Sequence, residues 1–558
     1  MKKTPGYLKY GMTAALAAYA SLSLAQGQPA KQPEKIVTTE EIVVERAYKP
    51  VLADAVKIRR SPDLDENKPF KPNLSYEILD KKLELNTDIR KLQAQELADI
   101  KETILKNNYI KAGAGNGNTG LGELYFATGK DEALQAGIFG KHLNQAGDQA
   151  GQKYSQQQFG AFGRSIQDKM TLGGDVRFDR KSTNFYGYNP EITTAPVNIQ
   201  KQTYSTLTLN GEVLERYEET GSNLGYAVKT NAYLLRNAFK ARENAFLVSG
   251  SVSKGFSRFH LGATAALDFT GTKDSSYRIS NNILRANPFV KLQGKNYDLT
   301  VGLNVVQEFG QTSRTSLLPA VTASFEIVPG FATLFGGYTG DVQKTTLLNL
   351  SNENMFINEN ILIKNALEKS NIYGGVKGNA GSGFGYKASA SFKTIEDMPL
   401  FVNNFTKAQK FDVVYDSKTE VIGLEGEISV KTGGMFNWTG KFIATDYNTS
   451  VQKQAWFKPG LEFLSNVHLV INKKLTIDGE VSLRGDSKAL TRETVAPFND
   501  KIVSVKSYTD LSAGAEYFFR EKVGLFLRVN NIFGTNYQRY LYYPSIGTTI
   551  FGGLNYSF

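Results

Sequence analysis

The residue types that usually carry chemistry are scarce and scattered in this 558-residue chain. It has no cysteine, and its three histidines, His142, His260 and His468, lie far apart in the sequence. The acidic run 63–67 offers oxygen ligands for calcium but lacks the glycine and the distal glutamate of an EF-hand loop. The glycine-rich run 113–120 lacks the lysine that completes a phosphate-binding loop, so we interpret it as a turn between two strands. The sequence therefore predicts no enzyme, no metal site and no cofactor.

Residues 1–25 have the pattern of a secretory signal peptide. Lys2, Lys3 and Lys9 form a basic start, a run of small and apolar residues follows over 11–25, and small residues precede the predicted cleavage site after Ala25. The run is too short for a comfortable membrane span, so a retained anchor is the weaker alternative. The net charge is +11, but an exported protein does not meet nucleic acid, and we expect no nucleic-acid partner.

Residues 26–107 form a separate polar region that is rich in lysine, acidic residues and proline and poor in aromatic residues. Its prolines, among them Pro50 and Pro62, interrupt any long element. Residues 41–45 can form a short strand, and apolar residues at helical spacing within 94–107 favour one amphipathic helix. Such a segment buries little core alone, so we expect a periplasmic N-terminal arm.

The remaining chain, 108–558, is a long succession of alternating apolar and polar residues. In 475–484, for example, Ile477 and Val481 alternate with Asp478 and Glu480. Such a strand fits a soluble sandwich with a wet outer face, and it fits equally a barrel whose apolar face meets lipid and whose polar face meets a lumen. The alternation by itself leaves both alternatives open.

Three further features favour the barrel. The pattern persists for some 450 residues without a helical domain, and short breaks such as 295–296 contrast with long insertions such as 341–368 and 486–505. The chain also ends on an amphipathic strand that places Tyr556 and Phe558 on one face, as in a signature for outer-membrane assembly. We therefore predict an all-β protein: a transmembrane antiparallel β-barrel of about 20–22 strands in the cell outer membrane, with the N-terminal periplasmic arm. At its strand ends we expect a girdle of aromatic residues, namely Tyr517, Phe518, Phe519, Tyr542 and Tyr543.

The last two predicted strands carry a family resemblance. Asn530, Asn531, Ile532 and Phe533, a tyrosine-rich loop, Pro544 and the final strand ending at Phe558 resemble the C-terminus of TonB-dependent receptors. The resemblance extends over about 350–558. Over 109–350 only the general pattern of alternating strands is similar. It implies partners: outer-membrane lipid, the barrel assembly machinery and TonB or another periplasmic or outer-membrane protein. The TonB-box-like segment would be Glu41, Ile42, Val43, Val44 and Glu45.

The chain departs from that family in one respect. Only about 82 residues separate the signal peptide from the first strand, which is too few for the family's plug domain of about 130–150 residues. In this respect it resembles short, plug-less barrels of the Bacteroidetes type.

Two functions remain open from the sequence. One is passage or uptake of a small solute or nutrient through a lumen of mixed charge, and the other is a non-transporting role in docking partner proteins for outer-membrane assembly or secretion. The residues expected to face the lumen are Asp478, Glu480, Arg484, Glu425, Glu427 and Lys431. Because an unplugged barrel of this width would leak, we also predict that 75–107 enters or caps the periplasmic mouth.

Overall fold

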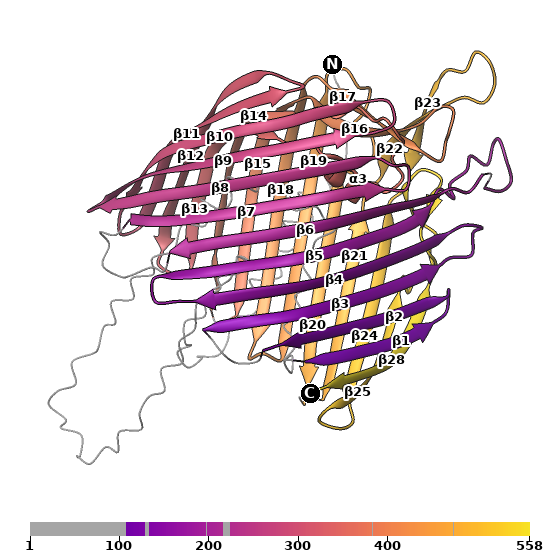
Figure 1. Ribbon diagram of the computed structural model, residues 1–558, viewed down its shortest axis with the longest axis horizontal. Helices are drawn as coiled ribbons and strands as arrows, with labels where there is room; N and C mark the ends of the chain where they lie inside the picture. The colour runs from indigo at the N-terminus through magenta and orange to yellow at the C-terminus, as the bar shows by residue number, and fades with distance from the viewer. Residues whose placement is uncertain (1–107, 129–132, 197, 216–223, 382, 473) are drawn as a thin grey trace, which may run out of the picture. The chain divides into compact units, whose positions relative to one another are not determined.

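One antiparallel sheet of 22 strands dominates the computed structural model, which describes residues 108–558 except 129–132, 197, 216–223, 382 and 473 (Figure 1). The signal peptide, the arm and the TonB-box-like segment therefore lie outside the described residues. The strands of this sheet are β1 (Tyr109–Gly115), β2 (Thr119–Ala127), β3 (Leu134–Ala146), β4 (Lys153–Ile166), β5 (Met170–Asn184), β6 (Lys201–Glu215), β7 (Leu224–Asn237), β8 (Arg242–Phe256), β9 (Phe259–Lys273), β10 (Arg278–Gln293), β11 (Tyr297–Gly310), β12 (Arg314–Val328), β13 (Ala332–Gln343), β14 (Ala366–Asn379), β15 (Phe384–Glu396), β18 (Thr419–Thr432), β19 (Phe436–Thr449), β20 (Leu461–Ile471), β21 (Leu475–Arg484), β24 (Tyr508–Phe518), β25 (Val523–Asn530) and β28 (Thr549–Ser557).

The sheet closes on itself. Strand β1 pairs with β2 on one side and with the last strand, β28, on the other, so that Tyr109 lies opposite both Tyr125 and Ser557. Closure leaves no sheet edge, which is what a β-structure needs in lipid, where no water is present to satisfy free backbone groups. The predicted all-β antiparallel barrel is thus confirmed, and its 22 strands agree with the predicted 20–22.

Alternation along each strand separates an outer face from an inner one. Leu234 on β7 and Phe246 on β8 are about half exposed, at 50% and 47%, whereas their neighbours Leu235 and Glu243 are fully buried. Long apolar side chains cover the outer face, as expected for contact with acyl chains. The inner face holds most of the charged side chains of the strands.

The two ends of the barrel differ in the length of their connections. Short turns such as 257–258, 294–296 and 433–435 join strands at the end that holds Tyr109 and Ser557. The other end has long connections, at 344–365, 397–418, 485–507 and 531–548. Short periplasmic turns and long external loops are the rule in outer-membrane barrels, so we assign the long connections to the outside.

The long connections contain small elements of their own. They are α3 (Leu347–Glu353) and three short hairpins, formed by β16 (Met398–Asn403) with β17 (Phe411–Asp416), β22 (Ser487–Arg492) with β23 (Asp500–Val505), and β26 (Gln538–Tyr540) with β27 (Tyr543–Pro544). Among the residues that the structure describes, no helix has the length and apolar character needed to cross a membrane.

The glycine-rich run 113–120 forms the predicted turn. Strands β1 and β2 meet there, and Gly117 and Asn118 both have positive φ, at 58° and 50°. Two consecutive positive φ values match the twist of a tight hairpin, and glycine and asparagine tolerate them best.

The predicted aromatic girdle is only partly correct. Tyr517 and Phe519 are exposed, but Phe518 shares its face with the lumen-facing Glu516. Tyr543 is 4% exposed and, with Tyr542 packed beside it, belongs to a buried cluster among the external loops. A tyrosine suits an interface and a polar-edged core equally well, so its type alone does not decide between them.

Candidate functional site

The external loops fold into a compact lid over the barrel lumen. We define the lid as residues 344–365, 397–418, 450–460, 485–507 and 531–548. Their apolar side chains form one buried cluster together with wall residues of β6 to β8, such as Tyr204 and Leu235. The lid therefore has a hydrophobic core of its own, continuous with the barrel wall.

Aromatic rings fill the centre of the lid. Phe356 and Tyr543 stack with ring centroids 3.6 Å apart, and Phe411 lies 5.5 Å from Phe457 and 5.4 Å from Tyr540. These rings come from four different loops, so each loop is held by the others. Rings in such offset and edge-on arrangements contribute beyond the burial of their area.

A buried wall carboxylate anchors the lid helix. Glu243, on β8, is 0% exposed and accepts hydrogen bonds from the backbone amides of Leu347 and Leu348 at 2.8 and 3.0 Å. It also accepts from Tyr233 Oη at 2.9 Å and from Thr272 Oγ1 at 2.7 Å. Amides in the first turn of a helix have no partner within the helix, and a carboxylate there also complements the helix dipole.

Two ion pairs hold the chain that leads into the lid helix. Lys344 Nζ donates to both the carboxylate and the backbone oxygen of Asp268 on β9, and both residues are buried. Arg285 on β10 donates from Nε to Asp341 at 3.2 Å. Burial lowers the pKa of Lys344, and the neighbouring Asp268 carboxylate opposes that shift.

An amide network holds the chain that leaves the lid helix. Asn365 donates to Glu308 on β11 at 2.8 Å and exchanges side-chain hydrogen bonds with Asn281 on β10 at 2.7 and 2.8 Å. Glu308, which is 1% exposed, also pairs with Arg314 on β12. Both ends of the helical loop are therefore fixed to the same sector of the wall, β8 to β12.

The other side of the lid reaches the opposite wall. Lys458 pairs with Glu353 at the end of α3, and Tyr540 Oη donates to the Glu353 carbonyl at 2.6 Å. Arg484 on β21 then donates to the carbonyl of Phe457 at 2.7 Å. Strands β8 and β21 are separated by half of the 22-stranded ring. A continuous chain of contacts therefore crosses the full width of the lumen.

Asp416 ties two lid loops together. It is 0% exposed and accepts hydrogen bonds from the amides of Ser450, Val451 and Gln452 at 2.7 to 3.1 Å, and from Thr419 Oγ1 at 2.8 Å. Burial alone would raise the pKa of the Asp416 carboxyl, but these hydrogen bonds outweigh burial and lower it. In the same lid core, burial raises the pKa of Tyr540, which keeps that phenol protonated and able to donate.

The predicted lumen residues lie on the inner face but away from the lid core. Arg484 is the exception, since it touches the lid. Asp478 Oδ1 lies 2.7 Å from His468 Nδ1, and Glu480 lies 3.7 Å from Arg528, with both carboxylate side chains about half exposed, at 49%.

Three strands away along the same wall, on β18, Glu425 pairs with lysines. Its carboxylate lies 3.2 Å from Lys441 and 3.9 Å from Lys387. Glu427 stands directly opposite both lysines in register, and Lys431 follows on the same face of β18. Below the lid, the described lumen wall therefore carries mixed, solvated charge.

The two residues of the predicted assembly signature face outwards. Tyr556 and Phe558 are 47% and 41% exposed, with ring centroids 5.4 Å apart. The backbone amide of Phe558 donates to the carbonyl of Asn108 at 3.0 Å, next to the seam where β28 meets β1.

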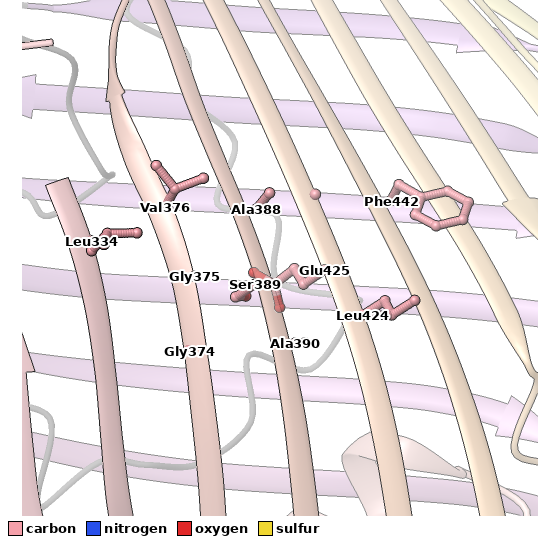
Figure 2. Close-up of a pocket in the computed structure, with 11 residues that line it drawn as sticks. Leu334, Gly374, Gly375, Val376, Ala388, Ser389, Ala390, Leu424, Glu425 and Phe442 are labelled. Carbon is pink, nitrogen blue, oxygen red and sulfur yellow. The ribbon is translucent and has the colours of Figure 1, made fainter. Parts of the chain in front are cut away.

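A shallow depression on the barrel lies on the membrane side rather than in the lumen. Small residues such as Gly374 and Ala390 leave room between Leu334, Leu424 and Phe442 on neighbouring strands (Figure 2). All five lie on the outward-facing register of β13 to β19. Within the described residues, no group of three or more histidine or acidic side chains could hold a metal ion.

Comparison with known proteins shows similarity of structure alone. No family model matches the chain, and no curated protein matches it. The FrpB iron transporter from Neisseria meningitidis (F3-3 variant) superposes with a TM-score of 0.61 at 12% identity, covering 81% of each chain. The siderophore receptor PirA from Acinetobacter baumannii gives 0.58 at 12% identity, over 81% of this chain and 80% of that one. FpvAI, solved in complex with pyocin S2, gives 0.59 at 11% identity, over 81% and 73%.

The fold is thus that of a TonB-dependent receptor-like outer-membrane barrel with 22 strands. The similar structures named above include an iron transporter and a siderophore receptor. The lid anchors Glu243, Asp268, Glu308 and Lys344 were not among the residues singled out from the sequence. Their only sequence signal is a polar residue at a lumen-facing position, which they share with many solvated residues.

Proposed function

We propose that this chain is a gated outer-membrane barrel, through which a small solute or nutrient passes only when the lid is displaced. The observation that carries the proposal is the chain of contacts from Glu243 on β8 to Arg484 on the opposite wall. Because this chain of contacts spans the lumen, we expect the closed lid to obstruct a solute. The structural similarity to iron transporters and siderophore receptors supports passage as the purpose of the lumen.

The wall beneath the lid supports a polar solute without a strong preference for one sign of charge. Glu425 lies among lysines on β15 and β19, and Asp478 and Glu480 lie on β21, two strands beyond β19. Such a surface stays hydrated and offers both donors and acceptors. It differs from a ring of one charge, which would select a single class of ion.

The N-terminal segments complete the proposal. Residues 1–25 would be removed on export, and 26–107 would remain as a periplasmic arm, the arrangement of the short, plug-less Bacteroidetes type. Residues 41–45 would add as a strand to the sheet edge of TonB or another periplasmic partner. Force on the arm would then reach the barrel through its attachment at β1, next to Phe558 on β28.

A non-transporting role is the second candidate. The observation that favours it is the strength of the closure, because Glu243, Asp268 and Glu308 are all buried with their hydrogen bonds made inside the protein. A permanently closed barrel would serve as a platform on which partner proteins dock for outer-membrane assembly or secretion.

Conductance of the purified protein in planar bilayers tests the gate. Because the chain has no cysteine, the pair Asp268→Cys and Lys344→Cys can be joined specifically by a short bismaleimide. The matched control joins Lys387→Cys to Glu425→Cys, two wall residues on neighbouring strands that do not touch the lid. We expect Glu243→Ala to raise conductance, the lid cross-link to suppress channel openings, and the wall cross-link to leave them unchanged.

Deletion of 26–107 tests whether the lid or the arm seals the pore. If deletion alone opens the pore while the lid is intact, the arm closes the barrel and the gated-lid proposal fails. If a variant that combines Glu243→Ala with deletion of 26–107 still shows no conductance, the non-transporting role is the better description. Val43→Pro with Val44→Pro should remove partner coupling in cells without changing conductance in bilayers.

A further inference from the structure

A row of basic side chains lies on the outer surface of the barrel at its external rim. Arg236 is the last but one residue of β7, Arg242 begins β8, Lys273 ends β9 and Arg278 begins β10. All four side chains are exposed. We call these four residues the cationic belt.

The pairing register places the four cations side by side. Arg236 lies directly opposite Arg242, Arg242 opposite Lys273, and Lys273 opposite Arg278. Side chains that are directly opposite on neighbouring strands are about 5 Å apart at Cβ, and like charges there destabilise the sheet. None of the four forms an ion pair with any residue in the part of the chain that the structure describes. An external anion bound between these cations would offset this repulsion.

The belt points away from the lumen. On the same strands the neighbouring inward positions, Leu235, Glu243 and Thr272, are 2% exposed or less. Arg180 on β5 and Lys201 on β6 extend the exposed basic surface towards the N-terminal strands. An acidic segment inside the barrel therefore cannot be its partner.

The apolar band of the membrane face begins directly beneath the belt. Leu234, Phe246 and Phe269 share the outward face with the belt residues of their strands and are 42–50% exposed. They lie two to four residues further into the membrane, which corresponds to about 7–14 Å along a strand. A ligand that contacts both surfaces must carry an anionic group about this far above its apolar chains.

The rim of another sector has a different charge pattern. On β14 to β19, Lys369 pairs with Glu396 and Lys418 with Glu420, and Asp446 is exposed on the outer face of β19. The cations there are neutralised by the protein itself. The unneutralised belt is therefore a local feature and not a property of the whole rim.

We propose that the cationic belt binds the phosphorylated headgroup of a lipid in the outer leaflet, whose acyl chains lie along the apolar band of β7 to β10. Arginine is well suited to this role because its guanidinium group can form two parallel hydrogen bonds to one phosphate. The site is separate from the lid and does not depend on whether the barrel transports a solute.

Native mass spectrometry of the detergent-purified, folded protein tests this inference, with phosphorylated lipid A and the same lipid after enzymatic dephosphorylation as probes. The test variant carries R236Q, R242Q, K273Q and R278Q. The control carries K369Q, K407Q, K418Q and K453Q, which removes four exposed external cations outside the belt. We expect the test variant to lose at least about tenfold in affinity for the phosphorylated lipid, and the control to bind as the wild type does.

Two results would overturn the proposal: equal binding of the phosphorylated and dephosphorylated lipids by the wild type, or wild-type affinity in the test variant. The first would mean that only acyl chains are recognised. Retention of lipid together with loss of a protein partner or of a dimer would assign the belt to an acidic protein surface. If the test variant does not fold, R242Q alone and the salt dependence of wild-type binding decide, because a phosphate contact must weaken as salt rises.

Discussion

The external and periplasmic parts of the lumen are built from similar residue types but behave as different environments. At the external end, Glu243 and Glu308 are at most 1% exposed, and both accept hydrogen bonds from residues of the lid. Further down, Glu480 and Asp478 have side chains that are 49% exposed, with Arg528 and His468 as respective ion-pair partners. The same inward face of the strands thus becomes a protein core in one place and a wet surface in the other.

The difference comes from the loops and not from the strands. The strands place polar residues at many of their inward positions, and this suffices for a hydrated lumen. Where five external loops fold inwards, those polar residues lose water and must find protein partners, because a buried unpaired polar group costs free energy. The lid residues supply these partners, including backbone amides of α3 and the side chains of Lys344 and Asn365.

The largest effect should follow from removing the anchor of the lid helix. Glu243→Ala leaves two helix amides and two hydroxyl groups without their acceptor, which we expect to destabilise the closed lid by about 3–5 kcal/mol. A reporter thiol at Ala489→Cys, which is buried in the lid, measures opening through its reaction with an impermeant maleimide. We expect the labelling rate to rise about a hundredfold or more, following the population of the open state.

A thiol at the exposed Ser417→Cys is the control for that experiment, since its labelling should not depend on the lid. If Glu243→Ala leaves the labelling of Ala489→Cys unchanged, the lid is held by its aromatic core alone. The buried carboxylates would then not distinguish the external part of the lumen from the periplasmic part. Glu243→Gln keeps one acceptor oxygen and should give an intermediate rate.

A smaller effect is expected on the outer face of the wet region. Val481 faces lipid on β21, between Glu480 and Ser482 on the inner face. Val481→Arg should cost about 2–4 kcal/mol if it lies near the middle of the membrane. The amount of heat-modifiable barrel recovered from outer membranes measures assembly, and wild-type recovery would mean that the inward and outward faces have been exchanged.

The sequence predicted the barrel well and its lid hardly at all. The alternation in 475–484 has a period that only a strand satisfies, and it is repeated often enough to predict the closed sheet and nearly its strand number. The lid has no such repeat. Leu400, Phe401 and Val402 look like part of another strand, and they do form one, β16, but in a small hairpin outside the barrel sheet.

The lid anchors were missed for a related reason. Glu243 and Glu480 are both acidic residues on the inner faces of barrel strands. What distinguishes them is whether a loop far away in the chain folds over them: α3 begins about a hundred residues after Glu243. Tyr543 was expected at the membrane interface for the same reason, because a contact with Phe356 nearly two hundred residues earlier is not visible in local sequence.

Acid should loosen the lid through Asp416. Since its pKa is lower in the folded lid than the ordinary value of 3.8, the ionised carboxylate stabilises the lid above that value. This contribution is lost as the pH falls from about 4 through the lowered pKa. Labelling of Ala489→Cys with an acid-tolerant thiol reagent should therefore accelerate below about pH 4.

Asp416→Asn is the matched variant for the acid experiment. It cannot ionise, so its lid should be looser at neutral pH, and its labelling rate should lose the step assigned to Asp416. An identical step in both proteins would mean that Asp416 is not the source of the acid sensitivity.

The smallest effect should come from the wet region itself. Glu480→Ala removes a carboxylate whose partner, Arg528, is 3.7 Å away and itself 41% exposed. A solvated pair of this kind contributes about 0–1 kcal/mol, and Arg528 remains hydrated after the change. Assembly, thermal stability and the labelling rate of Ala489→Cys should all stay at wild-type values. A destabilisation by Glu480→Ala as large as that of Glu243→Ala would show that the lower lumen is also packed with protein, and the arm 26–107 would then be the segment to test by deletion in the same background.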